Sequence, residues 1–146
     1  MATKPTAPRV MSGTFGMLYW NGEPVYEVKK FEAKLKVDRE DISFAGEMGK
    51  DSKLIGMGGE WSFTVNKVFS RGAKAISLEI KEGRDPRCQF NGKVDDPDAF
   101  GSERMTLYNC WFGDLDLMNF ESGKVINQEF SGGFTDFDFP DTVEVR

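Results

Sequence analysis

The chain has 146 residues, of which 39% are hydrophobic and 13% aromatic, and it contains no histidine. This length is typical of one domain, which can bury a core without a structural metal or a set of disulfides. Mechanisms that need an imidazole base, metal ligand or pH switch are excluded. Cys88 and Cys110 lack the spacing of a zinc site or of a disulfide framework, so we expect reduced thiols.

The net charge of −5 is unevenly distributed along the chain. Residues 1–40 and 41–93 each carry a net charge of +2, whereas residues 94–146 carry −9. Such acidity repels nucleic-acid phosphates, so a groove that grips DNA or RNA is not expected. The sequence shows no secretion signal and no apolar run of membrane-spanning length, which predicts a cytoplasmic protein without membrane binding. We expect residues 1–10 to form a flexible arm ahead of a single domain over residues 11–146.

A β-hairpin is predicted near the N-terminus. Residues 15–20 alternate in the manner of a strand, and Asn21-Gly22 supplies the two positive φ angles that a type I′ turn requires. The returning strand changes its phase of alternation between Val28 and Phe31. This change predicts a β-bulge near residues 29–30.

Residues 45–59 contain five of the 16 glycines and no usable period, which predicts a long loop. The apolar side chains in this segment are unusual for a solvated tip, so we expect the loop to dock on another chain. The residues expected in this contact are Gly46, Met48, Leu54, Ile55 and Met57.

The rest of the chain predicts more strands and one helix. Residues 61–65 alternate as a half-buried strand, and residues 69–81 have helical spacing, with Ser70 as N-cap and Gly83 as C-terminal stop. Further extended segments are predicted up to Val94 and over residues 104–117, 124–130 and 134–139. We expect a mainly β domain in which two antiparallel sheets pack as a β-sandwich or open barrel, with one flanking α-helix.

Acidic residues recur on the predicted C-terminal strands. Asp114 and Asp116 alternate with apolar residues, and so do Asp136 and Asp138, so each pair projects from one strand face. Solvent, a cation or a basic residue of another subunit would relieve the repulsion within each pair. The acidic turn over residues 95–98 lacks the ligand spacing of a calcium loop and is expected to be solvated.

Two further groups of side chains allow two interpretations each. Lys30, Lys34 and Lys36 form a basic stripe, which is either a solvated strand face or a contact with acidic residues of another copy. The three tryptophans are suited to a sugar-binding platform, but strand tryptophans in a phenylalanine-rich domain are more often core.

Five segments, which together span nearly the whole chain, carry one resemblance. They are residues 12–17 (SGTFGM), 28–33 (VKKFEA), 83–86 (GRDP), 101–108 (GSERMTLY) and 136–140 (DFDFP). In order and spacing they resemble the XkdM-like tail tube proteins of contractile-tailed phages, PBSX-type defective prophages and phage-tail-like bacteriocins. None of these segments is a catalytic signature, so an enzyme is not expected.

The resemblance implies a two-sheet tail tube fold and a homohexameric ring whose inner sheets join into one barrel around a lumen. Rings would stack into the hollow inner tube that conducts DNA or punctures the cell envelope, in contact with tail sheath, tape-measure and baseplate proteins and without a cofactor. The loop over residues 45–59 would contact a neighbouring subunit or ring. An acidic lumen would let DNA pass without adhering, and its candidate residues are Asp114, Asp116, Asp136 and Asp138.

The resemblance also implies assembly in the host bacterial cytoplasm and a final place in a virion tail or phage-tail-like particle. Residues 131–133 (SGG) stand where relatives carry a bulkier strand, and two glycines weaken strand pairing or mark a bulge.

Two other functions are compatible with the sequence. A tail ring protein that does not polymerise, such as a terminator or baseplate component, would share the fold. A cytosolic ligand-binding β-sandwich would use the tryptophans on a carbohydrate or small molecule. An enzyme is a distant third, because it would need one of the aspartate pairs to meet across a concave site.

Overall fold

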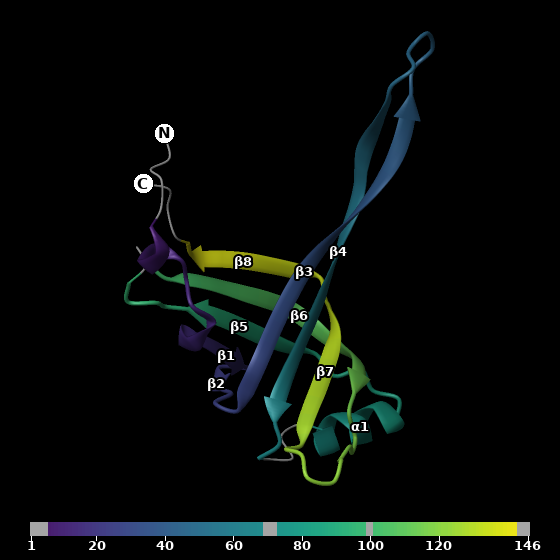
Figure 1. Ribbon diagram of the computed structural model, residues 1–146. Coiled ribbons are helices and arrows are strands. Elements are labelled where there is room, and N and C mark those ends of the chain that lie inside the picture. The colour runs from purple at the N-terminus through teal and green to yellow at the C-terminus, as the bar shows by residue number, and fades with distance from the viewer. Residues whose placement is uncertain (1–5, 69–72, 99–100, 143–146) are drawn as a thin grey trace.

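The computed structural model describes residues 6–68, 73–98 and 101–142. Eight antiparallel strands form one hydrogen-bonded sheet in the order β2-β1-β5-β6-β7-β4-β3, and β8 pairs with β6 beside this path (Figure 1). The strands are β1 (Gly16–Trp20), β2 (Glu23–Pro24), β3 (Val28–Ser43), β4 (Lys50–Asn66), β5 (Cys88–Val94), β6 (Glu103–Leu115), β7 (Asn127–Phe134) and β8 (Asp136–Asp141). The helical elements among the described residues are η1 (Ala7–Arg9), η2 (Gly13–Phe15) and α1 (Ala73–Lys81). The prediction of a mainly β, antiparallel domain with one α-helix is confirmed.

Strand β6 joins the two ends of the sheet. Its first part pairs with β5 and β8, and its last part, from Trp111 to Leu115, pairs with β7. The expectation of two packed sheets is not confirmed, because β6 carries hydrogen bonds from one group of strands into the other and the strands form one sheet. The extended segment predicted over residues 104–117 is confirmed as this single strand, which begins at Glu103 and ends at Leu115.

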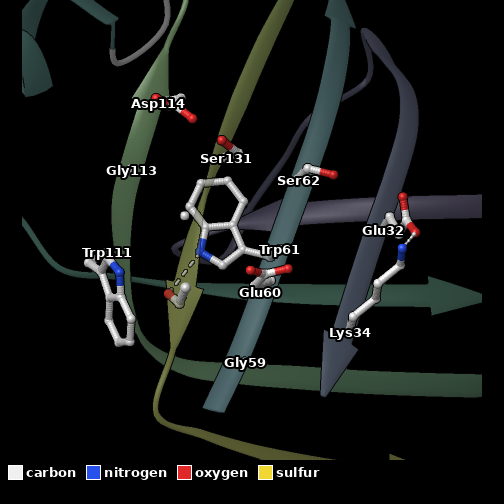
Figure 2. Close-up of a pocket in the computed structure, with 12 residues that line it drawn as sticks. Glu32, Lys34, Gly59, Glu60, Trp61, Ser62, Trp111, Gly113, Asp114 and Ser131 are labelled. Carbon is white, nitrogen blue, oxygen red and sulfur yellow. Dashed lines mark hydrogen bonds and ion pairs between the residues drawn. The ribbon is translucent and has the colours of Figure 1, made fainter. Parts of the chain in front are cut away.

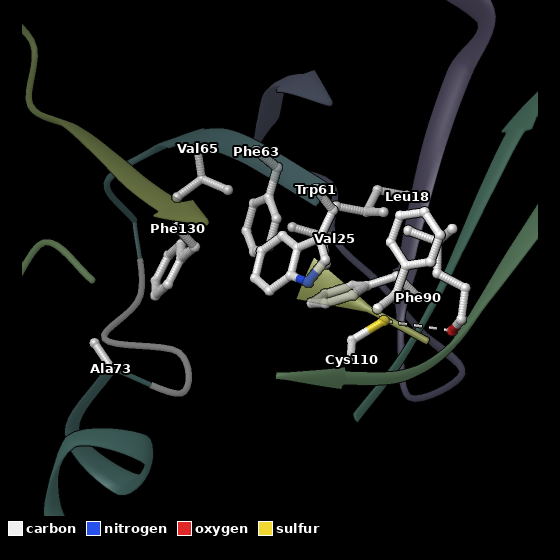
Figure 3. Packing of buried hydrophobic residues seen from close by; sticks show 11 residues of the cluster. Leu18, Val25, Trp61, Phe63, Val65, Ala73, Phe90, Cys110 and Phe130 are labelled. Atoms are coloured by element: carbon white, nitrogen blue, oxygen red, sulfur yellow. Dashed lines mark hydrogen bonds between the residues drawn. The ribbon is translucent and has the colours of Figure 1, made fainter. Parts of the chain in front are cut away.

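Aromatic side chains from distant strands fill one core (Figure 3). The Trp20 ring of β1 lies 5.8 Å from both the Phe63 ring of β4 and the Phe130 ring of β7. Trp61 of β4 lies 4.6 Å from Phe90 of β5. Strands that are far apart in the sheet order thus share a core, which the sheet encloses by curving. Burial of these large side chains is the main source of stability for such a domain.

The local predictions at the first hairpin and the helix are confirmed. Asn21 and Gly22 both have positive φ angles, 50° and 85°, and a register shift between Val28 and Lys30 marks the expected bulge. Helix α1 ends with Gly83 at a φ of 86°. Ser70 lies outside the described residues. Among the described residues, no helix is long and apolar enough to cross a membrane.

The segment over residues 45–59 is not a long loop, and that prediction is wrong. The turn is confined to residues 44–49, and residues 50–59 belong to β4, which pairs with β3 from Ser43↔Lys50 onwards. The glycines did not prevent pairing, because a strand that buries neither face accepts them. The result is a long two-stranded hairpin that projects from the rest of the molecule (Figure 1).

Strand β7 passes through residues 131–133 without the predicted weakening. It pairs with β4 on one side and with β6 on the other, and Gly132 lies opposite both Trp61 and Phe112. The irregularity lies instead in β6, whose register shifts at Gly113. A Cβ atom at Gly132 would overlap the carbonyl oxygen of Trp111, so glycine permits close approach of two backbones here.

The predicted solvated turn over residues 95–98 contains a buried acid, so that expectation is wrong for Asp96. Its side chain is only 6% exposed. Its Oδ2 accepts a hydrogen bond from the Ser12 N–H (2.9 Å), and its Oδ1 accepts one from the Asp98 N–H (3.0 Å). This carboxylate fastens the N-terminal segment to the β5–β6 connection.

Candidate assembly interface

Within the described part of the chain, no further strand lies beside the outer part of the β3–β4 hairpin. We call residues 35–58 the projecting hairpin. Pairing of β4 with β7 ends at Gly59↔Phe134, so beyond that point both hairpin edges are unpaired. From Gly59 to Lys50 the ribbon extends about 30 Å at 3.3 Å per residue. An isolated two-stranded ribbon is marginal in water and its free edges invite pairing, so this part of the hairpin is a candidate contact surface.

One face of the projecting hairpin is apolar along its inner part and polar nearer the tip, where Asp41 lies opposite Ser52. On β3, Leu35 and Val37 continue the alternation of the core-facing residues Phe31 and Ala33. On β4, Met57 lies opposite Val37, and beyond a bulge Leu54 lies opposite Arg39 on the same face. We call Leu35, Val37, Leu54 and Met57 the apolar stripe. Each of these side chains is at least 43% exposed, so the face that builds the core continues outward without cover.

The structure separates the predicted contact residues into two groups. Leu54 and Met57 lie on the apolar stripe, and Ile55 occupies the bulge between them, 62% exposed. Gly46, with a φ of 85°, and the fully exposed Met48 lie in the turn at the tip. All five therefore lie on the projecting hairpin, and their contact with another chain stays a prediction.

The opposite face of the β3–β4 hairpin carries both positive and negative side chains. Lys30, Lys34 and Lys36 lie on it, but Glu32 and Glu60 lie between them. Lys34 Nζ is 2.9 Å from Glu32 Oε1, and Lys36 Nζ is 2.8 Å from Glu60 Oε1. The stripe is therefore not purely basic, and its contact with another copy stays a prediction.

The Lys34–Glu32 ion pair shifts the pKa values of both side chains. Its hydrogen bond and charge lower the pKa of Glu32 and raise the pKa of Lys34. The contribution of Glu32 to folding stability is present at neutral pH and is lost as pH falls through its lowered pKa. The contribution of Lys34 to folding stability is lost as pH rises through its raised pKa. Both side chains are exposed, so solvent screens the pair and its effect on stability is small.

A shallow polar hollow of about 520 Å³ lies on this same face, between the hairpin and the end of β6 (Figure 2). Its lining includes Ser62, Ser131 and Asp114. The indole of Trp61 donates to the Gly133 carbonyl (3.0 Å), but the ring itself is 2% exposed and belongs to the core. Trp20 also packs in the core, so the tryptophans do not form one exposed platform for a sugar.

The candidate lumen acids form two separate pairs. Asp114 lies in the part of β6 that pairs with β7, whereas Asp136 and Asp138 lie on β8, opposite Tyr108 and Thr106 of β6. Eight residues of β6 separate Thr106 from Asp114, about 26 Å of strand. Within the C-terminal pair the alternation is as predicted, since Phe137 between the two acids packs against the core. The four carboxylates do not form one cluster, and which of them face a lumen stays a prediction.

Asp116 has a structural position just after β6. Its carboxylate Oδ2 accepts hydrogen bonds from the Glu129 N–H and from Asn119 Nδ2, both at 3.0 Å. Gln128 Nε2 donates to its main-chain carbonyl (2.7 Å). Asp116 therefore fixes the connection between β6 and β7.

That connection carries an apolar surface which the sequence reasoning missed. Residues 117–126 are all exposed, and they include five large apolar side chains. These are Leu117, Met118, Phe120, Val125 and Ile126. Three of these five residues lie in segments predicted as strands, 104–117 and 124–130, whereas β6 ends at Leu115 and β7 begins at Asn127. The available signal was Met118 and Phe120, two large apolar residues in the predicted connection.

Comparison with known proteins identifies the family. The family model described as "Phage tail tube protein" matches residues 3–141. The chain belongs to this family. It is 28% identical over 139 residues to the phage-like element PBSX protein XkdM of Bacillus subtilis (strain 168), covering 94% of this chain and 95% of that protein. The resemblance inferred from the five sequence segments is thus confirmed, and the family is one of structural tail proteins.

Solved structures share the fold of this tail tube family member. A chain of the sheath-tube complex of an extracellular contractile injection system, PVC, in the extended state superposes with a TM-score of 0.73 at 6% identity, covering 91% of this chain and 93% of that one. A chain from the tail of an empty GTA particle, refined with C6 symmetry, has a TM-score of 0.55 at 12% identity, covering 91% of this chain and 99% of that one. These likenesses establish the fold.

Proposed function

We propose that this tail tube family member closes into a homohexameric ring and that the rings stack into a hollow inner tail tube. The observation that carries the proposal is the projecting hairpin, whose apolar stripe continues the core face and whose two edges are unpaired. About half of each of its four apolar side chains is still exposed, so burying the remainder contributes about 1 kcal/mol per side chain in each repeated contact. The sixfold symmetry of a tail with the same fold supports the ring number.

A ring also resolves the exposed edges of the sheet. Among the described strands, β3 pairs with β4 alone over its 16 residues, and long unpaired edges promote aggregation. Closure of several sheets into one barrel pairs such edges, whereas end-to-end stacking of rings is a heterologous contact that propagates. The 1–10 arm is proposed to assist stacking. Within it, residues 7–9 form η1, and residues 1–5 lie outside the described part of the chain.

In this proposal the tube lies inside a tail sheath, ends on a baseplate, has its length set by a tape-measure protein and conducts DNA without binding it. Assembly takes place in the bacterial cytoplasm. One of the two acidic pairs lines the lumen. Exchange of Asp136 and Asp138 for lysine should leave assembly intact and retain DNA if that pair faces inward, and Asp114→Lys tests the other surface in the same assay.

Electron microscopy of the purified protein at increasing concentration tests the polymer. We expect hollow tubes of uniform width from the wild-type chain and only rings or monomers from the double variant Val37→Asp, Met57→Asp. Leu78→Asp, an exposed apolar residue of α1, is the matched control and should assemble normally. Circular dichroism verifies that each variant is folded. Normal tubes from the double variant would contradict the proposed role of the hairpin, and discrete rings from the wild-type chain would favour a non-polymerising ring protein.

A further inference from the structure

The structure places a second apolar surface at the far end of the strand that carries the apolar stripe. Leu54 of the stripe lies near the hairpin tip, and Asn66 at the other end of β4 pairs with Asn127, immediately after the 117–126 segment. The Lys67 N–H donates to the Ile126 carbonyl (2.9 Å), which holds this segment against the end of β4. Twelve residues of strand separate Leu54 from Asn66, about 40 Å.

The 117–126 segment forms an apolar hollow on a polar base. The hollow has a volume of about 300 Å³, with Leu117, Met118, Phe120 and Ile126 in its wall. Its base is held by hydrogen bonds, since Gln128 is bonded both to the Asp116 carbonyl and, through Oε1, to Lys67 Nζ (3.2 Å). The apolar side chains nevertheless remain exposed, Met118 by 83% and Phe120 by 77%. A contiguous exposed apolar surface of this kind is typical of a binding site for protein.

We infer that the 117–126 hollow receives the apolar stripe of a second copy of this chain. This inference rests on the proposed function and names the surface that the projecting hairpin contacts. A second copy is the occupant that the geometry favours, because one chain carries a projecting apolar ridge at one end of β4 and an apolar hollow at the other. Two complementary patches at opposite ends form a heterologous contact that repeats without closing. Every hairpin in the interior of such an assembly meets one hollow, and unmatched surfaces remain only at its two ends.

A photo-crosslinking experiment tests the contact directly. Phe120 is replaced with benzoyl-phenylalanine in the full chain, and 14N- and 15N-labelled protein are mixed before assembly, so that mass spectrometry separates crosslinks between copies from those within one. We expect crosslinks from position 120 to residues 35–37 or 54–57 of a second copy. The same amino acid at Leu78 is the matched control and should not crosslink to those residues.

A substitution in the hollow tests the same contact independently, through the protein concentration at which tubes form. Phe120→Asp should raise the protein concentration at which tubes appear by about tenfold or more, because it removes the burial of one large side chain from each contact. Leu78→Asp should leave that concentration unchanged. The side chain of Phe120 is exposed, so its substitution should leave the circular dichroism spectrum unchanged.

The outcomes distinguish this inference from the proposed function. Wild-type tubes whose crosslinks from position 120 map to other residues of the chain would overturn the inference and leave the tube standing. If the Phe120→Asp variant forms tubes at the same protein concentration as the wild-type chain, the inference is likewise overturned and the tube stands. Absence of any assembly from the wild-type chain at all concentrations would overturn both.

Discussion

Substitution of Gly132 by alanine should destabilise the fold severely. The added Cβ would overlap the carbonyl oxygen of Trp111 and lie 2.8 Å from its carbonyl carbon and 3.0 Å from the Cα of Phe112. All three atoms belong to the backbone of β6, so no side-chain rotation relieves the overlap. Strands β6 and β7 must separate at the point where β6 connects the two ends of the sheet.

The magnitude follows from two costs. Inserting one methyl group into a filled site costs about 1–3 kcal/mol even where side chains adjust, and each lost ladder hydrogen bond adds about 0.5–1.5 kcal/mol. We therefore expect Gly132→Ala to lower the free energy of unfolding by about 2–4 kcal/mol, measured by urea titration of tryptophan fluorescence at low protein concentration. Gly113→Ala is the control, because its Cβ would find no atom closer than 3.6 Å. If the free energy of unfolding of Gly132→Ala equals that of Gly113→Ala, the proposed close backbone contact between β6 and β7 at Gly132 is refuted.

Three further outcomes follow from local geometry. Asn109 has a φ of 54°, so Asn109→Ala should cost about 1–2 kcal/mol in the urea titration and Asn109→Gly clearly less. Asp96→Ala should speed hydrogen exchange at the Ser12 amide, which has lost its acceptor; unchanged exchange would contradict the anchoring role. Contact with the Cys110 thiol and burial raise the pKa of Cys88, so at pH 8 its alkylation by iodoacetamide should be slow in the folded chain and fast in urea; equal rates would contradict this.

Features set by neighbouring residues were predictable from the sequence. Asn21-Gly22 determines its turn through two positive φ angles. Gly83 follows the end of α1 in the expected way: its N–H donates to the Ile80 carbonyl (3.0 Å), and the Arg84 N–H donates to the Glu79 carbonyl (2.9 Å). Each motif depends on a few adjacent residues, so distant contacts have little effect on its backbone conformation.

Features set by distant residues were not predictable. The burial of Asp96 depends on Ser12, 84 positions away, and the close approach at Gly132 depends on the register of β6. The error over residues 45–59 has a different cause. A glycine-rich strand that buries neither face within its own chain shows no alternation of apolar and polar residues, so the sequence carries no strand signal there.

The apolar stripe extends the face that holds the core aromatic residues, so folding and assembly would bury one continuous surface in two steps. The first step covers Phe63 and Trp61 within the chain and leaves Leu35, Val37 and Met57 exposed. Substitutions at the inner end of this face should therefore reduce the stability of the monomer and its assembly together, whereas substitutions at the outer end should change assembly alone. Because β3 and β4 are single uninterrupted strands across this boundary, the folded body fixes the direction of the hairpin. In the proposed assembly, this would lower the entropy cost of the contact.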